Sequence, residues 1–257
     1  MGTPLLLEVL QRPGTSGTAA VLIAIYLFIT ARRITYADVG LSYEQCLERG
    51  ELYRVWTAQL SHIDLLHLLF NVSALWSVST AELGDGGTVM YLRTSALLLV
   101  VSGAVTLLFY YILGVRLGRE RYLRVTAVGY SAVIFGWMTL LAARGKGAFS
   151  VLGVAEMPMW ASPLVTLVLT SIIVPQASFL GHLAGIVAGF AVAFGLFGWL
   201  TASGAAALVA WLVVLSLVPL ARSGRLPFVT ALGPSEPPGD VETGSALRIV
   251  NGVLERR

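Results

Sequence analysis

The sequence contains few charged residues for its length. Charged residues make up 12% of its 257 positions and hydrophobic residues 56%, and the mean hydropathy is +0.80. Because globular domains carry about a quarter charged residues, this composition predicts a chain that crosses the lipid bilayer several times. The net charge of +3 is small. With no long run of lysine and arginine, we expect no nucleic-acid partner.

Cysteine and targeting signals are equally scarce. The lone cysteine, Cys46, excludes an intramolecular disulfide and a thiolate metal cluster. Residues 1–17 lack a basic start that runs into an apolar core, so we expect no cleavable signal peptide. Leu6 stands where a myristoylation motif requires serine or threonine. Targeting is therefore expected to depend on the first membrane span.

Long apolar stretches, in contrast, are abundant. A membrane-spanning helix needs roughly 20 mostly apolar residues. Seven stretches approach this length, and they predict an all-α fold, a polytopic transmembrane helical bundle. They cover about residues 15–31, 63–81, 92–114, 125–143, 160–175, 178–200 and 203–221. The sequence has no internal repeat of the kind found in many transporters.

The segments outside these spans differ in character. Residues 1–14 predict an interfacial segment with a short helix, in which Thr3 is the N-cap and Pro4 the first helical residue. The loop over 32–61 mixes aromatic, leucine and charged residues, which favours a structured element at the membrane interface. Residues 222–257 are polar and proline-rich in part, and predict a disordered tail.

The basic residues are distributed unequally between alternate loops. The loops after the first and third spans contain eight arginines: Arg32, Arg33, Arg49, Arg54, Arg116, Arg119, Arg121 and Arg124. The N-terminus and the loops after the second and fourth spans contain four basic residues: Arg12, Arg93, Arg144 and Lys146. By the positive-inside rule, this difference would place the N-terminus outside.

All three histidines lie in or beside apolar stretches. His62 and His67 are in "SHIDLLHLLFN", together with Asp64 and Asn71, and His182 is in "FLGHLAGIVAG". The fourth span adds a hydroxyl at Ser131. His67 and Asn71 are four residues apart and therefore share one helix face. Ionisable groups at membrane depth usually face the protein interior or a water-filled cavity, so these residues are the candidate functional site.

Three interpretations of this polar set are open. The residues could simply join helices by hydrogen bonds. They could bind zinc, but the spacing of five between His62 and His67 makes their rings diverge, and no carboxylate on the fourth or sixth span completes a coordination shell. We therefore expect neither a metal nor a cofactor. The third interpretation is nucleophilic catalysis, in which a histidine takes the proton of a serine.

The residues suffice for a minimal acyl-transfer site. Ser131 would be the nucleophile and His182 the base, while His67 and Asn71 could donate hydrogen bonds to the oxyanion. Small residues at spacings of four allow helices to approach closely. Gly181, Gly185 and Gly189 form one such row beside His182, and Ala132 and Gly136 form another beside Ser131. If these rows face each other, serine and histidine lie beside the same helix contact.

From about Ser42 to Leu200 the chain resembles the rhomboid intramembrane serine proteases. "HIDLLHLLFN", "GYSA" and "GHLAGIVAG" are similar to the family's histidine–asparagine, serine and histidine–glycine motifs, in the same order, and "YRVWTAQLSH" resembles its aromatic–arginine element. "GYSAVIFGWMTLL" and "MGTPLLLEVL" are similar to the plant rhomboid-like protein 13 branch. The resemblance implies a rhomboid-like six-helix core over 15–200, an additional C-terminal helix over 201–221, and a cytosolic N-terminus.

The resemblance also implies roles for individual residues. Ser131 would be the nucleophile and His182 the general base, and His67, Asn71 and the Ser131 N–H would hold the oxyanion. Other residues would have supporting roles: they would stabilise the serine-bearing segment, the interfacial loop, the contact between the two helices, or the ring of His182. These supporting residues are His62, Gly129, Ala132, Phe135, Gly185, Gly189, Tyr53 and Arg54. Ala132 departs from the family's glycine, and its methyl group is expected to separate the helices slightly and to slow the reaction.

By the same resemblance the substrate is another transmembrane protein, cleaved in or near its membrane segment. Water must reach Ser131, which predicts a polar cavity open toward the 32–61 loop, and the substrate would enter past the fifth span. The expected location is a multi-pass position in a eukaryotic endomembrane, namely the Golgi, the endoplasmic reticulum or the plasma membrane. The alternative is a catalytically inactive relative that binds membrane clients for trafficking or degradation. The oligomeric state is left open.

Overall fold

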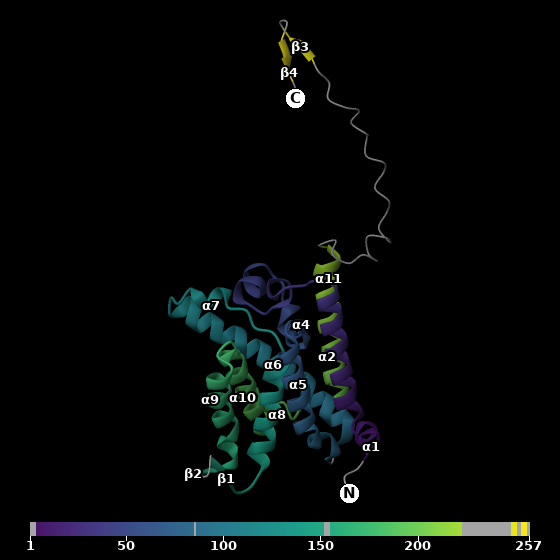
Figure 1. The fold of residues 1–257 in the computed structure, drawn as a ribbon, viewed down its shortest axis with the longest axis vertical. Coiled ribbons are helices and arrows are strands. Elements are labelled where there is room, and N and C mark those ends of the chain that lie inside the picture. Colours follow the sequence, from purple (N-terminus) through teal and green to yellow (C-terminus); the bar gives the residue numbers. More distant parts are fainter. Residues whose placement is uncertain (1–3, 85, 152–154, 223–247, 251–252, 256–257) are drawn as a thin grey trace. The chain divides into compact units, whose positions relative to one another are not determined.

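The structure, a computed structural model, describes residues 4–84, 86–151, 155–222, 248–250 and 253–255. The chain forms two units, Met1–Ser216 and Leu217–Arg257. The first unit is a bundle of helices around α8 and α10, which pack side by side (Figure 1). Its helices are α1 (Leu5–Gln11), α2 (Pro13–Ala31), α3 (Tyr36–Val39), η1 (Glu44–Glu48), α4 (Arg54–Leu60), α5 (Leu65–Val78), η2 (Ser79–Leu83), α6 (Gly87–Tyr111), η3 (Ile112–Arg116), α7 (Arg121–Arg124), α8 (Ser131–Arg144), η4 (Met159–Ala161), α9 (Ser162–Ile173), α10 (Phe179–Ala193) and most of α11 (Ala202–Arg222).

Each of the seven predicted spans contains an apolar helix, which confirms the helical membrane bundle. Among the described residues, two helices are long and apolar enough to cross a membrane, Pro13–Ala31 and Gly87–Arg116. A third span is possible if Arg54–Leu60 and Leu65–Leu83 act together, although they are bent by 93°. Four further apolar helices are shorter: Ser131–Arg144, Met159–Ile173, Phe179–Ala193 and Ala202–Leu215.

Two helix boundaries differ from the prediction in ways that affect the site. The fourth span was predicted to begin at 125, but α8 begins at Ser131, because the preceding segment is extended and Ala127 forms a β-bridge with Leu41. The sixth span was predicted to reach 200, but α10 ends at Ala193, shortly before Gly195 turns the chain with φ +79°. Only glycine adopts such a φ readily.

The all-α prediction missed two short hairpins. Between α8 and α9, β1 (Ala148–Val151) pairs antiparallel with β2 (Ala155–Pro158). This pairing follows Gly147, whose φ of +103° turns the chain out of the preceding helix. In the second unit, β3 (Arg248–Val250) pairs with β4 (Val253–Glu255), within the tail predicted to be disordered. The rest of that tail, residues 223–247, 251–252 and 256–257, lies outside the described residues.

The segments predicted to lie at the interface are helical. The loop over 32–61 contains α3, η1 and α4, as expected for a structured element. At the N-terminus, α1 begins at Leu5, so Pro4 is the residue before the helix and not its first residue. A proline there has an extended backbone, with ψ 138°. The predicted N-cap, Thr3, lies outside the described residues.

The main core lies where α8 meets α2, α5, α6 and α10. The buried apolar side chains of this core include Leu22, Leu75, Leu98, Val133 and Leu140. The rings of Tyr91 and Trp137 stack with their centroids 5.1 Å apart, and the Trp137 indole N–H donates to the Ser95 hydroxyl at 2.9 Å. These contacts fix α8 against α6, and thereby fix the helix that begins at Ser131.

Candidate active site

Ser131 is the first residue of α8, directly after an extended segment. The segment is held on two sides. Leu41 and Ala127 exchange two backbone hydrogen bonds of 2.9 and 3.0 Å, and the Gly129 N–H donates to the Ala58 carbonyl at 3.0 Å. Gly129 has φ +103°, a conformation that a side chain would strain. The first N–H groups of a helix have no partner within the helix, so the Ser131 hydroxyl lies beside backbone donors.

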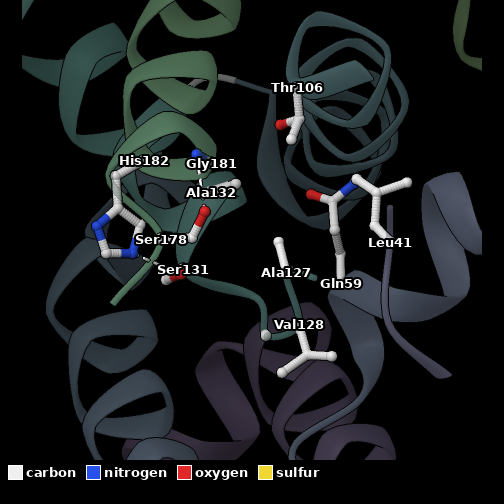
Figure 2. Close-up of a pocket in the computed structure, with 11 residues that line it drawn as sticks. Leu41, Gln59, Thr106, Ala127, Val128, Ser131, Ala132, Ser178, Gly181 and His182 are labelled. Carbon is white, nitrogen blue, oxygen red and sulfur yellow. Dashed lines mark hydrogen bonds between the residues drawn. The ribbon is translucent and has the colours of Figure 1, made fainter. Parts of the chain in front are cut away.

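His182, one turn into α10, contacts this serine directly. Its Nε2 atom is 2.8 Å from the Ser131 Oγ atom, within hydrogen-bond distance (Figure 2). The His182 ring stacks on Phe135, with the centroids 4.5 Å apart. The Nδ1 atom is buried and has no hydrogen-bond partner among the described residues. The arrangement is thus a serine–histidine pair in which an aromatic ring, rather than a carboxylate, sets the orientation of the imidazole.

The close approach of α8 and α10 depends on glycine. A Cβ atom added to Gly189 would lie 2.5 Å from the Gly136 carbonyl oxygen and 2.6 Å from the Thr139 Cβ. At Gly185 the three nearest atoms would all belong to the Ala132 main chain. Distances this short leave no room for a side chain, so both helices need these glycines. Gly181, the third glycine of the predicted row, faces only Ser178 of its own helix.

Ala132 contributes main-chain atoms to this contact, and it also lines the cavity beside Ser131 (Figure 2). Its methyl group is not among the three atoms nearest to Gly185. The expectation that this methyl group would force the helices apart therefore has no support in the packing at Gly185.

His62 and His67 lie against the segment that precedes Ser131, and Asn71 contacts the two histidines. The His62 Nε2 atom accepts a long hydrogen bond, 3.4 Å, from the Tyr130 N–H, directly before Ser131. The rings of His62 and His67 meet edge to face at 5.1 Å. The His67 ring also lies against Gly129, where an added Cβ would be 2.5 Å from Cε1 and 2.7 Å from Nε2. Both histidines therefore contact the segment that ends at Ser131.

The side chains of Asn71 and Asp64 each form a hydrogen bond with the backbone of α5. The Asn71 side-chain NH₂ donates to the His67 carbonyl at 2.8 Å. The Asn71 side chain also forms a hydrogen bond with the buried His62 ring, so its amide is held between two neighbours. Asp64, which the sequence placed among the polar span residues, is the N-cap of α5, and its carboxylate accepts the His67 N–H at 3.0 Å. Asp64 therefore positions His67.

Tyr53 and Arg54 lie outside the site but support its framework. Arg54 is buried and forms an ion pair with Glu51. Its NH1 group donates to the carbonyls of Ala37 and Gly40, both at 3.0 Å. Because Gly40 precedes Leu41, which is paired with Ala127, Arg54 stabilises the partner of the serine-bearing segment. The Tyr53 ring lies 5.9 Å from the guanidinium carbon.

A small cavity opens beside the serine–histidine pair (Figure 2). About 20 Å³ of it is open to the centre of a water molecule, and one water needs roughly 10–15 Å³ by this measure. Besides Ser131 and His182, the lining includes the polar side chains of Gln59, Thr106 and Ser178. Ser178 also caps α10, with its Oγ accepting the Gly181 N–H at 3.1 Å. The volume of the cavity is that of about one water molecule, but its exposed lining is mostly apolar, so the polar cavity predicted from the sequence is not found here.

Gln59 was missed in the sequence, since a single glutamine carries no motif. The side chain is buried, and it joins α4 to α6. Its Nε2 group donates to the carbonyls of Val55 and Leu99, at 2.7 and 2.6 Å, and its Oε1 accepts from the Ser102 hydroxyl at 2.9 Å. The adjacent residue, Ala58, holds the Gly129 N–H. Gln59 therefore stabilises α4, and the Ala58 carbonyl of this helix accepts the Gly129 N–H of the serine-bearing segment.

Replacing Gln59 by leucine keeps the volume of the side chain but removes these three hydrogen bonds. We expect Gln59→Leu to lower the free energy of unfolding by about 1–3 kcal/mol, because it leaves the Ser102 hydroxyl and the Leu99 carbonyl buried without this partner. The midpoint of thermal unfolding in detergent measures the effect. Gln11→Leu, at the exposed end of α1, is the matched control. Equal midpoints for the two variants would contradict the argument.

Cys46 and the clustering of possible metal ligands were the other candidates for reactive chemistry in the described part of the chain. Burial raises the pKa of the Cys46 thiol to about 11, and a protonated thiol is a poor nucleophile. In the ranges that the structure covers, no three histidine, cysteine, aspartate or glutamate side chains gather as metal ligands would. The chemistry supported by these residues is that of Ser131 and His182.

Comparison with known proteins identifies the family. Residues 49–199 match the family model described as Rhomboid domain. Rhomboid-like protein 15 of Arabidopsis thaliana is 28% identical over 190 residues, which cover 72% of this chain and 47% of that protein. Rhomboid-type serine protease 2 of Saccharomyces cerevisiae is 31% identical over 186 residues, which cover 70% of this chain and 66% of that protein. Rhomboid-related protein 4 of Homo sapiens is 32% identical over 180 residues, which cover 69% of this chain and 55% of that protein.

The chain spans about half to two thirds of the length of these curated relatives. The relatives come from a plant, a fungus and an animal, so the predicted plant branch stays a prediction. The match to the family covers more than half of the chain, from within the interfacial loop to the end of the predicted sixth span. Together with the apolar helices, it shows that this chain is an integral membrane protein and belongs to the rhomboid family of intramembrane serine proteases.

Proposed function

We propose that this chain hydrolyses peptide bonds of transmembrane proteins, with Ser131 as nucleophile and His182 as general base. The observation that carries the proposal is the 2.8 Å distance between the Ser131 Oγ and the His182 Nε2 atoms, beside a cavity large enough for water. A serine needs such a base, because its hydroxyl is a weak nucleophile until the proton is taken. The stacked Phe135 ring keeps the imidazole in place.

The proposed reaction follows acyl transfer. The Ser131 oxygen attacks the scissile carbonyl while its proton passes to His182 Nε2. The oxyanion accepts hydrogen bonds from the Ser131 N–H, the His67 ring and the Asn71 amide, which must first give up one of its present partners. His182 then protonates the leaving amine. Water from the cavity hydrolyses the ester in a second addition, and His182 again takes and returns the proton.

The substrate in this proposal is a membrane protein with an unwound segment near the end of its helix. A helical peptide bond is shielded by its own turns, so the segment must be extended to reach Ser131. Ser131 begins α8 and His182 lies in the first turn of α10, so the extended segment would meet the site at the ends of these short helices, of 14 and 15 residues. Entry past α9, a seven-span topology and residence in a Golgi, endoplasmic reticulum or plasma membrane belong to the same proposal.

A fluorophosphonate probe tests the nucleophile without knowledge of the substrate. Attack by Ser131 Oγ on phosphorus displaces fluoride and forms a stable ester, which peptide mass spectrometry locates. We expect labelling of the purified protein at Ser131, and no labelling of Ser131→Ala. An adduct on another serine, or none on a folded protein, would count against the proposal.

The alternative function, binding of membrane clients without cleavage, is favoured by one observation, the alanine at position 132. In the structure the Ala132 main chain makes the contact with Gly185, so we expect Ala132→Gly to change the cleavage rate less than about tenfold, since the reacting groups keep their positions. Initial rates in liposomes, with Ala143→Gly on the same helix as control, measure this. An inactive chain that gains activity only with Ala132→Gly would instead support client binding by the native protein.

A further inference from the structure

Four arginines gather where α6 ends and the chain turns toward α8. We define the arginine corner as residues 112–124; its cations are Arg116, Arg119, Arg121 and Arg124, and its one carboxylate is Glu120. All four arginines are exposed. The corner lies at the end of the first unit opposite the β1–β2 hairpin (Figure 1). Neither the serine–histidine chemistry nor the core packing uses these charges.

The corner is compact, so its charges are held close together. The wider turn η3 ends α6, and Gly118, with φ +64°, reverses the chain. The Arg119 N–H donates back to the Leu113 carbonyl at 3.0 Å. α7 then packs on η3, where Leu123 occupies the space beside Gly114. The backbone that carries the four arginines is therefore folded and not an extended linker.

The length of α6 places this surface at the membrane boundary. Gly87–Arg116 is long and apolar enough to cross a membrane. The 22 residues between Arg93 and Arg116 include no charged side chain. At about 1.5 Å per residue they rise about 33 Å, close to the thickness of the hydrocarbon layer, about 30 Å. With Arg93 near one boundary, Arg116 reaches the headgroups at the other.

Exposed apolar side chains are interleaved with the arginines. Ile112, Val115 and Leu117 are 39%, 47% and 61% exposed. A surface that combines exposed apolar groups with basic groups lies in the interfacial plane, with the apolar groups at the acyl boundary and the cations among the headgroups. A soluble acidic peptide would leave these apolar side chains in water. The combination therefore favours a lipid surface as the occupant.

The carboxylates nearby leave the surface positive. Among the described residues, Arg116 and Arg119 form no ion pair, and Arg121 contacts only the Tyr122 hydroxyl and ring. Arg124 is 3.8 Å from Glu44, which is also paired with Arg49, and the Arg124 side chain is 84% exposed. Guanidinium groups bind phosphate oxygens with two parallel hydrogen bonds. Several of these donors thus point to solvent.

We propose that the arginine corner binds the phosphate groups of anionic lipids in the bilayer that surrounds the chain. Only residues 125–130 separate Arg124 from Ser131, and this segment is paired with Leu41. Lipid bound at the corner is thereby attached to one end of the segment that carries the serine. Binding does not depend on the protease reaction, and it is selective for headgroup charge.

Native mass spectrometry of the full chain in detergent tests this binding. The chain is titrated with short-chain phosphatidylglycerol or phosphatidylcholine, and the lipid-bound fraction is measured. We expect phosphatidylglycerol to bind more tightly, and Arg116→Gln/Arg119→Gln to weaken its binding about twenty-fivefold, since each basic residue near an anionic surface contributes about fivefold. The matched control is Arg144→Gln/Lys146→Gln, which removes two exposed charges at the opposite end and should change little.

Three results would overturn the proposal. An equal loss of phosphatidylglycerol binding in the two double variants would mean that binding depends only on the net charge of the protein. Equal binding of both lipids would remove the role of headgroup charge. Displacement of the lipid by a soluble polyglutamate peptide or by inorganic phosphate at the same concentration would assign the surface to a peptide or a free anion. Equal thermal midpoints for the native chain and both variants ensure that binding, and not folding, is compared.

Discussion

Ser131→Ala and His182→Ala are each expected to abolish cleavage of a single-span substrate in liposomes, with a loss of about 10⁴-fold or more in the initial rate. The two side chains act as one unit, because the hydroxyl has no base without His182, and the imidazole has no nucleophile without Ser131. Losses from such a pair do not add. We therefore expect the double variant to be as inactive as each single variant, and no worse.

The controls separate lost chemistry from lost folding. Ser77→Ala removes a hydroxyl that bonds only to the Ser73 carbonyl of its own helix at 3.1 Å, and it should cleave at the native rate. The thermal midpoints of Ser131→Ala and Ser77→Ala should agree within a few degrees. A Ser131→Ala variant that keeps more than about a tenth of the rate would place the nucleophile elsewhere, since a catalytic serine contributes far more than tenfold.

The pairing of Ser131 with His182 could be predicted from the sequence because it depends on short-range patterns. Histidine, serine and glycine occur at helical spacings on apolar stretches, and their order resembles a known family. The structure brings the two side chains to 2.8 Å. The close contacts at Gly185 and Gly189 follow from the same spacing, since an i,i+4 row lies on one helix face.

Other features depend on contacts between distant segments and left no local signal. The start of α8 at Ser131 is set by the bridge between Leu41 and Ala127. Hydropathy depends only on residue types, and residues 125–130 are mostly apolar. A hydropathy window therefore has the same value whether this segment is helical or extended, and it cannot detect the bridge. Gln59 joins α4 to α6 across forty positions in the chain. The role of Ala132 was expected to depend on its methyl group, yet its main chain makes the contact with Gly185.

The histidines illustrate why composition and geometry must be combined. Counting residues shows that all three histidines lie in or beside apolar stretches, but the count cannot distinguish hydrogen bonding between helices from catalysis. The contacts assign them different surroundings: His182 contacts the serine, His67 contacts Gly129, and His62 contacts the Tyr130 N–H. One residue type thus meets three successive positions of the serine-bearing segment.

Gly185→Ala tests whether the serine–histidine pair depends on the spacing between α8 and α10. An added methyl group would overlap the Ala132 main chain, with the carbonyl carbon at 2.8 Å and Cα at 3.1 Å. Main-chain atoms cannot rotate away as a side chain can, so the helices must separate. Overpacking of this kind costs about 1–3 kcal/mol, and a displacement of about 1 Å in a reacting group can cost about a hundredfold in rate.

We therefore expect Gly185→Ala to lower both the thermal midpoint and the cleavage rate, the latter about a hundredfold. Gly136→Ala should be milder, because the nearest atom to its added Cβ is the Leu98 Cδ2 at 2.7 Å, at the end of a flexible side chain. Gly17→Ala on α2, where nothing lies within 4 Å, should be neutral or stabilising, since alanine favours helices by about 0.5–1 kcal/mol over glycine. If Gly185→Ala behaves like Gly17→Ala, the spacing of these helices does not control the reaction, and the short distance between Ser131 and His182 must be maintained by the loops instead.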